Sequence, residues 1–177
     1  MGTKVLIAGF GNLLRGDDGF GVTVVKRLSA SKDPKGLPDG VKVMEVGISG
    51  VSLVQELMDV YDALIVVDAV DRGEEPGTVY QIEPSIKDLS TIDLDAQREF
   101  LSDMHFIEPS RALALAKVLG VLPPWVLILG CQPLTTEELR IGLSPSVNKA
   151  VVKAVEQIHE LIQEFARENS VVKGPGN

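Results

Sequence analysis

Two aspartates and a histidine are the side chains of this sequence best suited to chemistry. Asp18 follows an apolar run and a glycine-rich turn, Asp68 ends another apolar run, and His105 lies shortly before a predicted helix. Ligands of open α/β sheets bind beyond the carboxyl ends of the strands, so the two aspartates could converge on one crevice. Two carboxylates and an imidazole make an open site for a borderline divalent cation such as nickel or zinc. The spacing alone leaves an ordinary capping or surface role open for His105.

The glycine-rich turn before Asp18 also has an alternative interpretation as a nucleotide site. Gly9-Phe10-Gly11 directly after a strand is the first half of a dinucleotide-binding motif, but the third glycine is replaced by Leu14. Asp17 and Asp18 stand where a pyrophosphate would meet a helix N-terminus and would repel it. The residue types therefore favour a cation over a phosphate.

Three further side chains receive ordinary structural interpretations. Asp17 is expected to act as an acid at a helix N-terminus, where it stabilises the helix dipole. Cys131 follows an apolar run with no histidine near it in sequence, which predicts a buried, unreactive cysteine. His159 falls one residue beyond the apolar face of the last predicted helix, so we expect it at the surface.

Alternating strand and helix patterns must position these residues. Short apolar runs predict strands, and apolar residues at helical spacing predict helices. Strands are expected over residues 4–10, 41–46, 63–68, 78–83 (an edge strand) and 125–130, and helices over 20–31, 51–58, 109–119 and 146–167. This order predicts a single three-layer α/β/α sandwich around a mostly parallel sheet of about five strands. Residues 1–168 are expected to form one domain, and residues 169–177 a frayed tail.

Composition limits the class of partner. The chain has 177 residues, with 17 basic and 25 acidic side chains and a formal charge of −8. This charge disfavours nucleic acid and anionic membranes as partners. The N-terminal apolar run is too short for a signal peptide, and no apolar stretch is long enough to cross a membrane. With its single cysteine, the chain is expected in the reducing cytoplasm.

The sequence resembles the hydrogenase maturation endopeptidases over about residues 4–165. The most specific likeness is the pattern G-x-G-N-x-L-x-x-D-[DE]-G-x-G, which is met by Gly9, Gly11, Asn12, Leu14, Asp17, Asp18, Gly19 and Gly21. Further matches are the turn at residues 47–50, the V-D-A ending at residues 67–69, the P-G-T at 76–78, the D-M-H at 103–105, and the stretches at 130–133 and 141–147.

The resemblance implies both an activity and a site. It implies an endopeptidase that removes the C-terminal extension of a nickel–iron hydrogenase large-subunit precursor. Asp18, Asp68 and His105 would form a metal-binding triad that is also catalytic, and the nickel would be carried by the substrate, although other divalent cations could occupy the triad. Separately from the resemblance, the permissive backbone geometry of glycine suggests that the amides of the turn with Gly47, Ser49 and Gly50 could hold the substrate strand or the oxyanion.

The chemistry of cleavage stays open between two roles. A carboxylate such as Asp18 could act as general base on a water molecule, as in an aspartyl-type peptidase. Alternatively, a cation shared by enzyme and substrate could polarise the scissile carbonyl. Two other functions also remain: a nickel-binding assembly factor that does not cleave, and a nucleotide-binding α/β protein.

Overall fold

A five-stranded sheet forms the centre of the molecule. The computed structural model describes residues 3–30, 36–89, 93, 95 and 108–172, with side chains up to residue 168. The strands lie in the order β2-β1-β3-β5-β4. They are β1 (Val5–Phe10), β2 (Val41–Gly47), β3 (Ala63–Ala69), β4 (Val79–Ile82) and β5 (Trp125–Cys131). All neighbours pair in parallel except the edge strand β4, which pairs antiparallel with β5.

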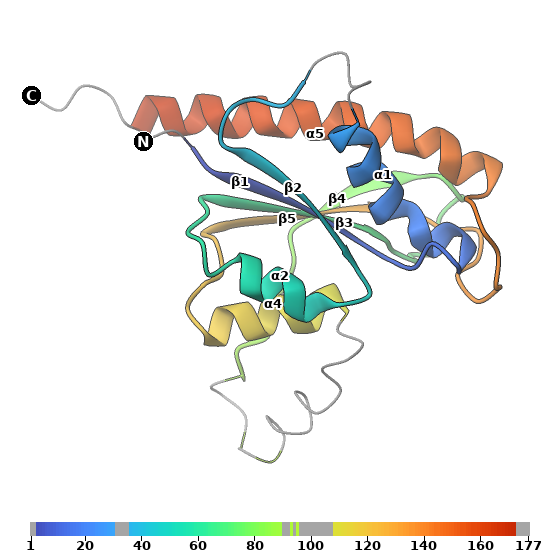
Figure 1. Cartoon of the computed structure of the whole chain (residues 1–177), viewed down its shortest axis with the longest axis horizontal. Helices are drawn as coiled ribbons and strands as arrows, with labels where there is room; N and C mark the ends of the chain where they lie inside the picture. Colours follow the sequence, from blue (N-terminus) through green and yellow to red (C-terminus); the bar gives the residue numbers. More distant parts are fainter. Residues whose placement is uncertain (1–2, 31–35, 90–92, 94, 96–107, 173–177) are drawn as a thin grey trace, which may run out of the picture.

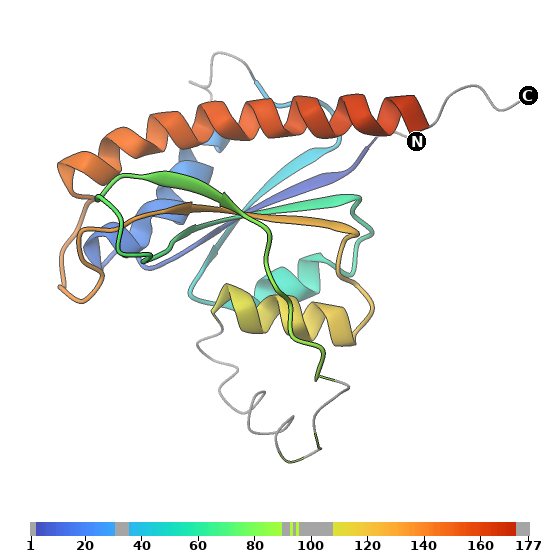
Figure 2. The same ribbon diagram turned by 180° about the vertical axis from the view of Figure 1, so that it is seen from behind.

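Helices cover both faces of this sheet. The helices are α1 (Phe20–Ser29), α2 (Gly50–Glu56), α4 (Pro109–Val118) and α5 (Pro145–Val172), with a short 3₁₀ helix η1 (Gly16–Gly19) directly before α1. Figures 1 and 2 show α1 and α5 together on one face and α2 and α4 on the other. The predicted α/β/α sandwich of about five strands is therefore confirmed.

The strands at the centre are buried on both faces, which explains their continuous apolar runs. Every residue of β1 is buried. Because side chains alternate along a strand, Val5 and Ile7 belong to the core under α1 and α5, whereas Leu6, Ala8 and Phe10 belong to the core under α2 and α4.

The sheet has a topological switch point between β1 and β3. The chain leaves β1 toward β2 on one side and then returns across β1 to reach β3 on the other. The connections that follow β1 and β3 therefore diverge, and they leave a crevice beyond the carboxyl ends of these two strands. The sequence predicted that these two ends are adjacent, and their parallel pairing confirms it.

Glycines bring α1 unusually close to this end of the sheet. A Cβ on Gly21 would lie 2.1 Å from the carbonyl oxygen of Val67 and 2.5 Å from that of Phe10. A Cβ on Gly9 would lie 2.4 Å from the carbonyl oxygen of Gly21. Only glycine allows the first turn of α1 to rest directly on β1 and β3. The glycine pattern shared with a nucleotide motif therefore serves backbone packing here.

The element boundaries differ from the sequence prediction in two informative places. The four-residue η1 was not predicted, because so short a segment has no periodicity to detect. Helix α5 continues to Val172, so residues 169–172, which were assigned to a frayed tail, are helical. Residues 173–177 lie outside the described residues. In the part of the chain that the structure describes, no helix is long and apolar enough to span a bilayer.

Candidate active site

A pocket of about 170 Å³ opens at the switch point of the sheet. Residues from the ends of β1, β2 and β3 and from the start of α4 line it: Phe10, Gly11, Asp18, Gly47, Ile48, Asp68, Glu108 and Pro109. Two of the three predicted metal ligands, Asp18 and Asp68, thus share one pocket. His105 lies outside the described residues.

A self-supporting loop holds Asp18. The backbone N–H of Asn12 donates to Oδ2 of Asp18 (2.8 Å), and the backbone N–H of Leu14 donates to Oδ1 of Asn12 (3.0 Å). Gly11 has φ +118°, and a Cβ there would lie 1.7 Å from the carbonyl oxygen of Asp18. The tight turn needs glycine at this position, and it fixes the half-buried Asp18 carboxylate at the pocket.

The strand β3 aims Asp68 at the same pocket. Leu64 and Val66 pack in the core under α2 and α4. Alternation along the strand therefore puts Asp68 on this face, just beyond the packed core. Burial raises the pKa of Asp68 to about 8, and the negative charges of Asp18 and Glu108 add to the rise, which a backbone hydrogen bond from Ala69 partly opposes.

This electrostatic environment fits a cation. A carboxylate with a raised pKa beside a second carboxylate is a place where negative charge is in excess, and a divalent ion would relieve it. Carboxylate oxygens also suit divalent cations as ligands. Among the described residues, no group of three His, Cys, Asp or Glu side chains is arranged to hold a metal ion. The described part of the pocket therefore supplies two donors of a site that needs at least one more.

The sequence did not single out Glu108, which is a third carboxylate at the pocket. It is the residue immediately before α4, whose first residue is Pro109. Proline is common at the first position of a helix, so Pro109 marks the start of α4 in the sequence. Glu108, the residue before it, could therefore have been predicted at the N-terminal end of this helix.

The turn between β2 and α2 forms another wall of the pocket. Gly47 has φ +62°, and its carbonyl oxygen accepts a hydrogen bond from the backbone N–H of Gly11 (3.0 Å). Gly47 and Ile48 line the pocket. Ser49 is the N-cap residue of α2 and Gly50 is its first residue, so these two predicted substrate-binding residues follow directly along the same turn.

The interpretation of Asp17 as a simple helix-dipole acid is wrong. Asp17 is 2% exposed. Its Oδ1 accepts from the backbone N–H of Ser144 (2.6 Å), and its Oδ2 accepts from the hydroxyl of Ser144 (2.8 Å) and the backbone N–H of Leu134 (2.9 Å). Asp17 therefore holds the β5–α5 loop, residues 132–144, against the loop that carries Asp18.

Of the predictions for Cys131 and His159, the first is confirmed and the second is wrong. Cys131 is fully buried, as predicted, and burial together with the charge of Asp17 raises its pKa to about 12. A thiol with this pKa is a poor nucleophile at neutral pH. The prediction for His159 is wrong, because its side chain is only 5% exposed.

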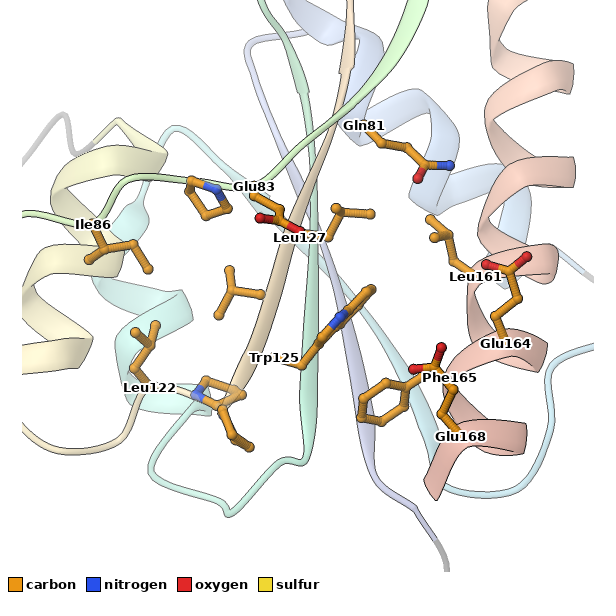
Figure 3. Close-up of a pocket in the computed structure, with 14 residues that line it drawn as sticks. Gln81, Glu83, Ile86, Leu122, Trp125, Leu127, Leu161, Glu164, Phe165 and Glu168 are labelled. Atoms are coloured by element: carbon orange, nitrogen blue, oxygen red, sulfur yellow. The ribbon is translucent and has the colours of Figure 1, made fainter. Parts of the chain in front are cut away.

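A larger pocket of about 500 Å³ lies at the opposite end of β5 (Figure 3). Trp125, the first residue of β5, packs there against Phe165 of α5, with ring centroids 5.2 Å apart. Figure 3 shows Glu83, Glu164 and Glu168 near the apolar side chains. This pocket is at the amino end of the parallel strands, where α/β sheets seldom bind substrates. We therefore assign the candidate active site to the smaller pocket.

Comparisons with known proteins agree on one family. The family model for hydrogenase maturation proteases matches residues 22–161. The hydrogenase expression/formation protein HoxM of Azotobacter vinelandii is 37% identical over 169 residues, which cover 96% of this chain and 75% of HoxM. The crystal structure of a hydrogenase 2 maturation peptidase from a Thaumarchaeota archaeon is 33% identical, with a TM-score of 0.62 over 90% of this chain and 98% of that one. The hydrogenase maturating endopeptidase HybD of E. coli is 26% identical, with a TM-score of 0.68 over 92% of this chain and 94% of that one. The chain therefore belongs to the hydrogenase maturation protease family, and it is a peptidase.

Proposed function

We propose that this peptidase removes the C-terminal extension of a nickel–iron hydrogenase large-subunit precursor after nickel has been inserted. The observation that carries the proposal is the pair of carboxylates, Asp18 and Asp68, in one pocket of a chain that belongs to this family. A pocket with excess negative charge recognises a cation that arrives with the substrate.

His105 is proposed as the third member of the site. It precedes Glu108, which lines the pocket, by three residues, and three residues of extended chain reach at most about 10 Å. The chain length therefore allows the imidazole to reach Asp18 and Asp68. With His105, these carboxylates would hold the nickel of the substrate, and the remaining coordination positions would stay with the large subunit.

The enzyme's own residues support hydrolysis by water. Cys131 is buried and unreactive, so it is not a candidate nucleophile. Burial and the neighbouring acids raise the pKa of Asp68 to about 8 when no cation is bound. A cation beside the carboxylate would lower this pKa and leave Asp68 charged and able to accept a proton from water. Asp18 or Asp68 would act as general base, while the cation carried by the substrate would polarise the scissile carbonyl.

The turn at residues 47–50 is proposed to position the substrate strand. Gly47 already uses its carbonyl oxygen to hold Gly11, which keeps the turn beside the pocket. The N–H of Ser49 already donates to the carbonyl oxygen of Val46 (3.3 Å). The backbone amides of Gly47 and Gly50 are therefore proposed to bind the substrate backbone or the oxyanion of the tetrahedral intermediate, with Ser49 holding the shape of the turn. The reaction is proposed to take place in the cytoplasm, where reducing conditions suit a chain with a single cysteine.

The deciding experiment compares nickel-loaded and nickel-free precursor as substrates. Intact mass measurement should show loss of the C-terminal extension from the nickel-loaded precursor only. Asp18→Asn should abolish cleavage, because the amide keeps an acceptor for the N–H of Asn12 but loses the charge. An unchanged precursor mass with nickel transfer would identify a non-cleaving assembly factor. Cleavage of both precursors at equal rates would refute recognition through nickel.

A further inference from the structure

Large apolar side chains are exposed on the loops around the candidate active site. The residues of this group, which we call the apolar rim, are Leu13, Leu14, Ile48, Leu134, Leu139 and Ile141. All six stand on connections that follow the carboxyl ends of β1, β2 and β5. Leu139 is 88% exposed and Ile141 84%. Single exposed apolar residues are common, but a group at one end of a molecule marks an interaction surface.

The apolar rim adjoins the pocket directly. Ile48 lines the pocket beside Asp18 and Asp68. Leu13 and Leu14 belong to the same loop as Asp18, and the backbone N–H of Leu14 is held by Asn12. A partner that covers the rim would therefore also cover the entrance to the pocket.

The β5–α5 loop is held rigidly in place although its tip is exposed. Arg15 and Arg140 form an isolated β-bridge, in which the backbone N–H of Arg140 donates to the carbonyl oxygen of Leu14 (2.9 Å). The backbone N–H of Gly16 donates to the carbonyl oxygen of Arg140 (2.7 Å). In both Figure 1 and Figure 2 this loop, drawn in orange, lies beside the start of α1.

The buried Asp17 fixes both ends of the same loop. Its carboxylate accepts hydrogen bonds from Leu134 near the beginning of the loop and from Ser144 at its end. Leu139 and Ile141 flank the bridged Arg140, and Leu14 precedes the bridged Arg15, so these three apolar residues occupy neighbouring positions. A rigid loop loses little conformational entropy when a partner binds, which is a property of preorganised docking surfaces.

Charge indicates what kind of partner fits. Arg15 and Arg140 are both exposed and adjacent in the bridge, on a chain whose formal charge is −8. Glu137 and Glu138 of the same loop are exposed as well, so the rim offers apolar contacts among charges of both signs. It fits a folded protein whose surface combines apolar and charged side chains. Because Ile48 of the rim also lines the pocket, the protein that supplies the strand to be cut is the occupant expected here.

We propose that the apolar rim, centred on Leu14, Leu139 and Ile141, is the docking surface for the folded body of the large-subunit precursor. This inference rests on the proposed function, because it names where the same substrate is held. The pocket binds the nickel and the strand to be cut, and the rim binds the precursor at a distance from the reacting atoms. Binding energy from this remote contact positions the scissile bond.

Steady-state processing of nickel-loaded precursor by Ile141→Asp and Leu139→Asp tests the proposal. Each substitution puts a negative charge into the rim without touching the pocket or a buried contact. We expect kcat/KM to fall at least 10-fold, mainly through KM. The matched control is Val60→Asp, since Val60 is 81% exposed but lies between α2 and β3 at the other end of the sheet. The control should retain the kcat/KM of the parent.

The outcomes separate this inference from the proposed function. If the parent enzyme does not cleave the precursor, the proposed function fails. If the parent cleaves it and Ile141→Asp and Leu139→Asp do so equally well, the rim is not the docking surface. Sedimentation of the same variants tests the alternative that the rim is a contact between two copies of this chain. A loss of self-association with unchanged kcat/KM would identify a contact between two copies of the chain and overturn the proposal.

Discussion

Asp68, which we propose as a metal ligand, lies at the pocket at the expense of stability. Asp68 lies where burial and two neighbouring acids disfavour its charge. A neutral side chain of the same size would be accommodated better in the isolated protein. An ionisable side chain in a pocket that lowers the stability of the fold is typical of a ligand-binding or catalytic site.

The first prediction is that Asp68→Asn stabilises the metal-free protein in a pH-dependent way. The pKa of Asp68 rises from 3.8 to about 8 on folding, so between about pH 4 and 8 the folded state binds more protons than the unfolded state. The free energy of unfolding of the parent therefore falls as pH rises through this interval. Asparagine does not titrate. The free energy of unfolding of Asp68→Asn should therefore exceed that of the parent by an amount that grows from near zero at pH 4 to a few kcal/mol at pH 8, at about 1.4 kcal/mol per pH unit at most.

Urea unfolding in the presence of a chelator, from pH 4 to pH 8, measures this difference. Asp39→Asn is the control for the loss of one acidic side chain, because Asp39 is exposed and distant from the pocket lining. A difference between Asp68→Asn and the parent that stays constant with pH would contradict the raised pKa. Processing by Asp68→Asn should be lost at every pH, since the substitution removes a proposed metal ligand.

The second prediction concerns Asp17, whose role the structure corrected. Both carboxylate oxygens of Asp17 accept hydrogen bonds from donors of Leu134 or Ser144. In Asp17→Asn one of these oxygens becomes an NH₂ group, which faces a donor instead of accepting from it. Losing a buried charged acceptor costs about 1–3 kcal/mol. For a chain of this size we expect the melting temperature to fall by roughly 2–10 °C. Processing should also weaken, because the β5–α5 loop loses its anchor.

Thermal unfolding and processing assays of Asp17→Asn check this expectation, again beside Asp39→Asn. A loss of no more than about 1 kcal/mol together with full processing activity would restore the simple helix-dipole role for Asp17. The sequence could not reveal the true role, because the partners of Asp17 lie 117 and 127 residues away along the chain. Sequence spacing predicted that Asp18 faces the crevice, since that depends only on the strand and turn directly before it.

At the scale of the elements, glycine determines how α1 rests on the sheet. The third prediction is that Gly21→Ala destabilises the protein and displaces Asp18. A Cβ at this position would lie 2.1 Å from the carbonyl oxygen of Val67, so the helix must move away. Overpacking of this kind costs about 1–3 kcal/mol or more. Processing should fall because Asp18, three residues before Gly21, moves relative to Asp68.

Gly73→Ala is the matched control for this substitution. A Cβ on Gly73 meets nothing within 4 Å, so only its left-handed backbone (φ +74°) adds about 1–2 kcal/mol. Chemical denaturation measures stability, and the precursor assay measures activity. Wild-type activity in Gly21→Ala would show that the close approach of α1 is not needed to place Asp18.

Most elements were predictable because their burial leaves a direct mark on the sequence. Strands β1 and β3 are buried on both faces and read as continuous apolar runs. Helix α5 was found from its period, but its buried face is broader than the predicted stripe. The helix packs against α1 and also against β4 and β5, so His159 is buried beside Ile158. Periodicity predicts which side of a helix is buried, whereas its neighbours decide how wide that side is.

At the scale of the whole molecule, the apolar pocket and the candidate active site lie at opposite ends of the parallel strands. The amino ends of the parallel strands carry the large apolar pocket of Figure 3, and the carboxyl ends carry the carboxylates, the glycine turns and the apolar rim. The strand order creates this separation, because the switch point between β1 and β3 lies at the carboxyl end only. Loops at this end can therefore specialise for a partner without altering the core.

The last prediction is that a divalent cation stabilises the whole fold through this end of the sheet. A ligand that binds only the folded state at 100 times its dissociation constant adds about 2.7 kcal/mol, which raises the melting temperature by roughly 5–10 °C for a chain of this size. We expect this rise with Ni²⁺ or Zn²⁺ near pH 7.5 and a much smaller one at pH 5. Protons compete for Asp68, whose pKa is about 8, and for the imidazole of His105, whose ordinary pKa is about 6.5.

Variants decide whether that cation sits in the proposed site. Asp18→Asn, Asp68→Asn and His105→Ala should each lose most of the rise, and a chelator should reverse it in the parent. Glu168→Gln, at the opposite pocket, should keep the rise. If His105→Ala retains the rise in melting temperature while both aspartate variants lose it, the third ligand is another group. Glu108 is the first to test, because it lines the same pocket and its charge raises the pKa of Asp68. If all three variants retain it, the cation binds elsewhere, and recognition of nickel by this pocket is wrong.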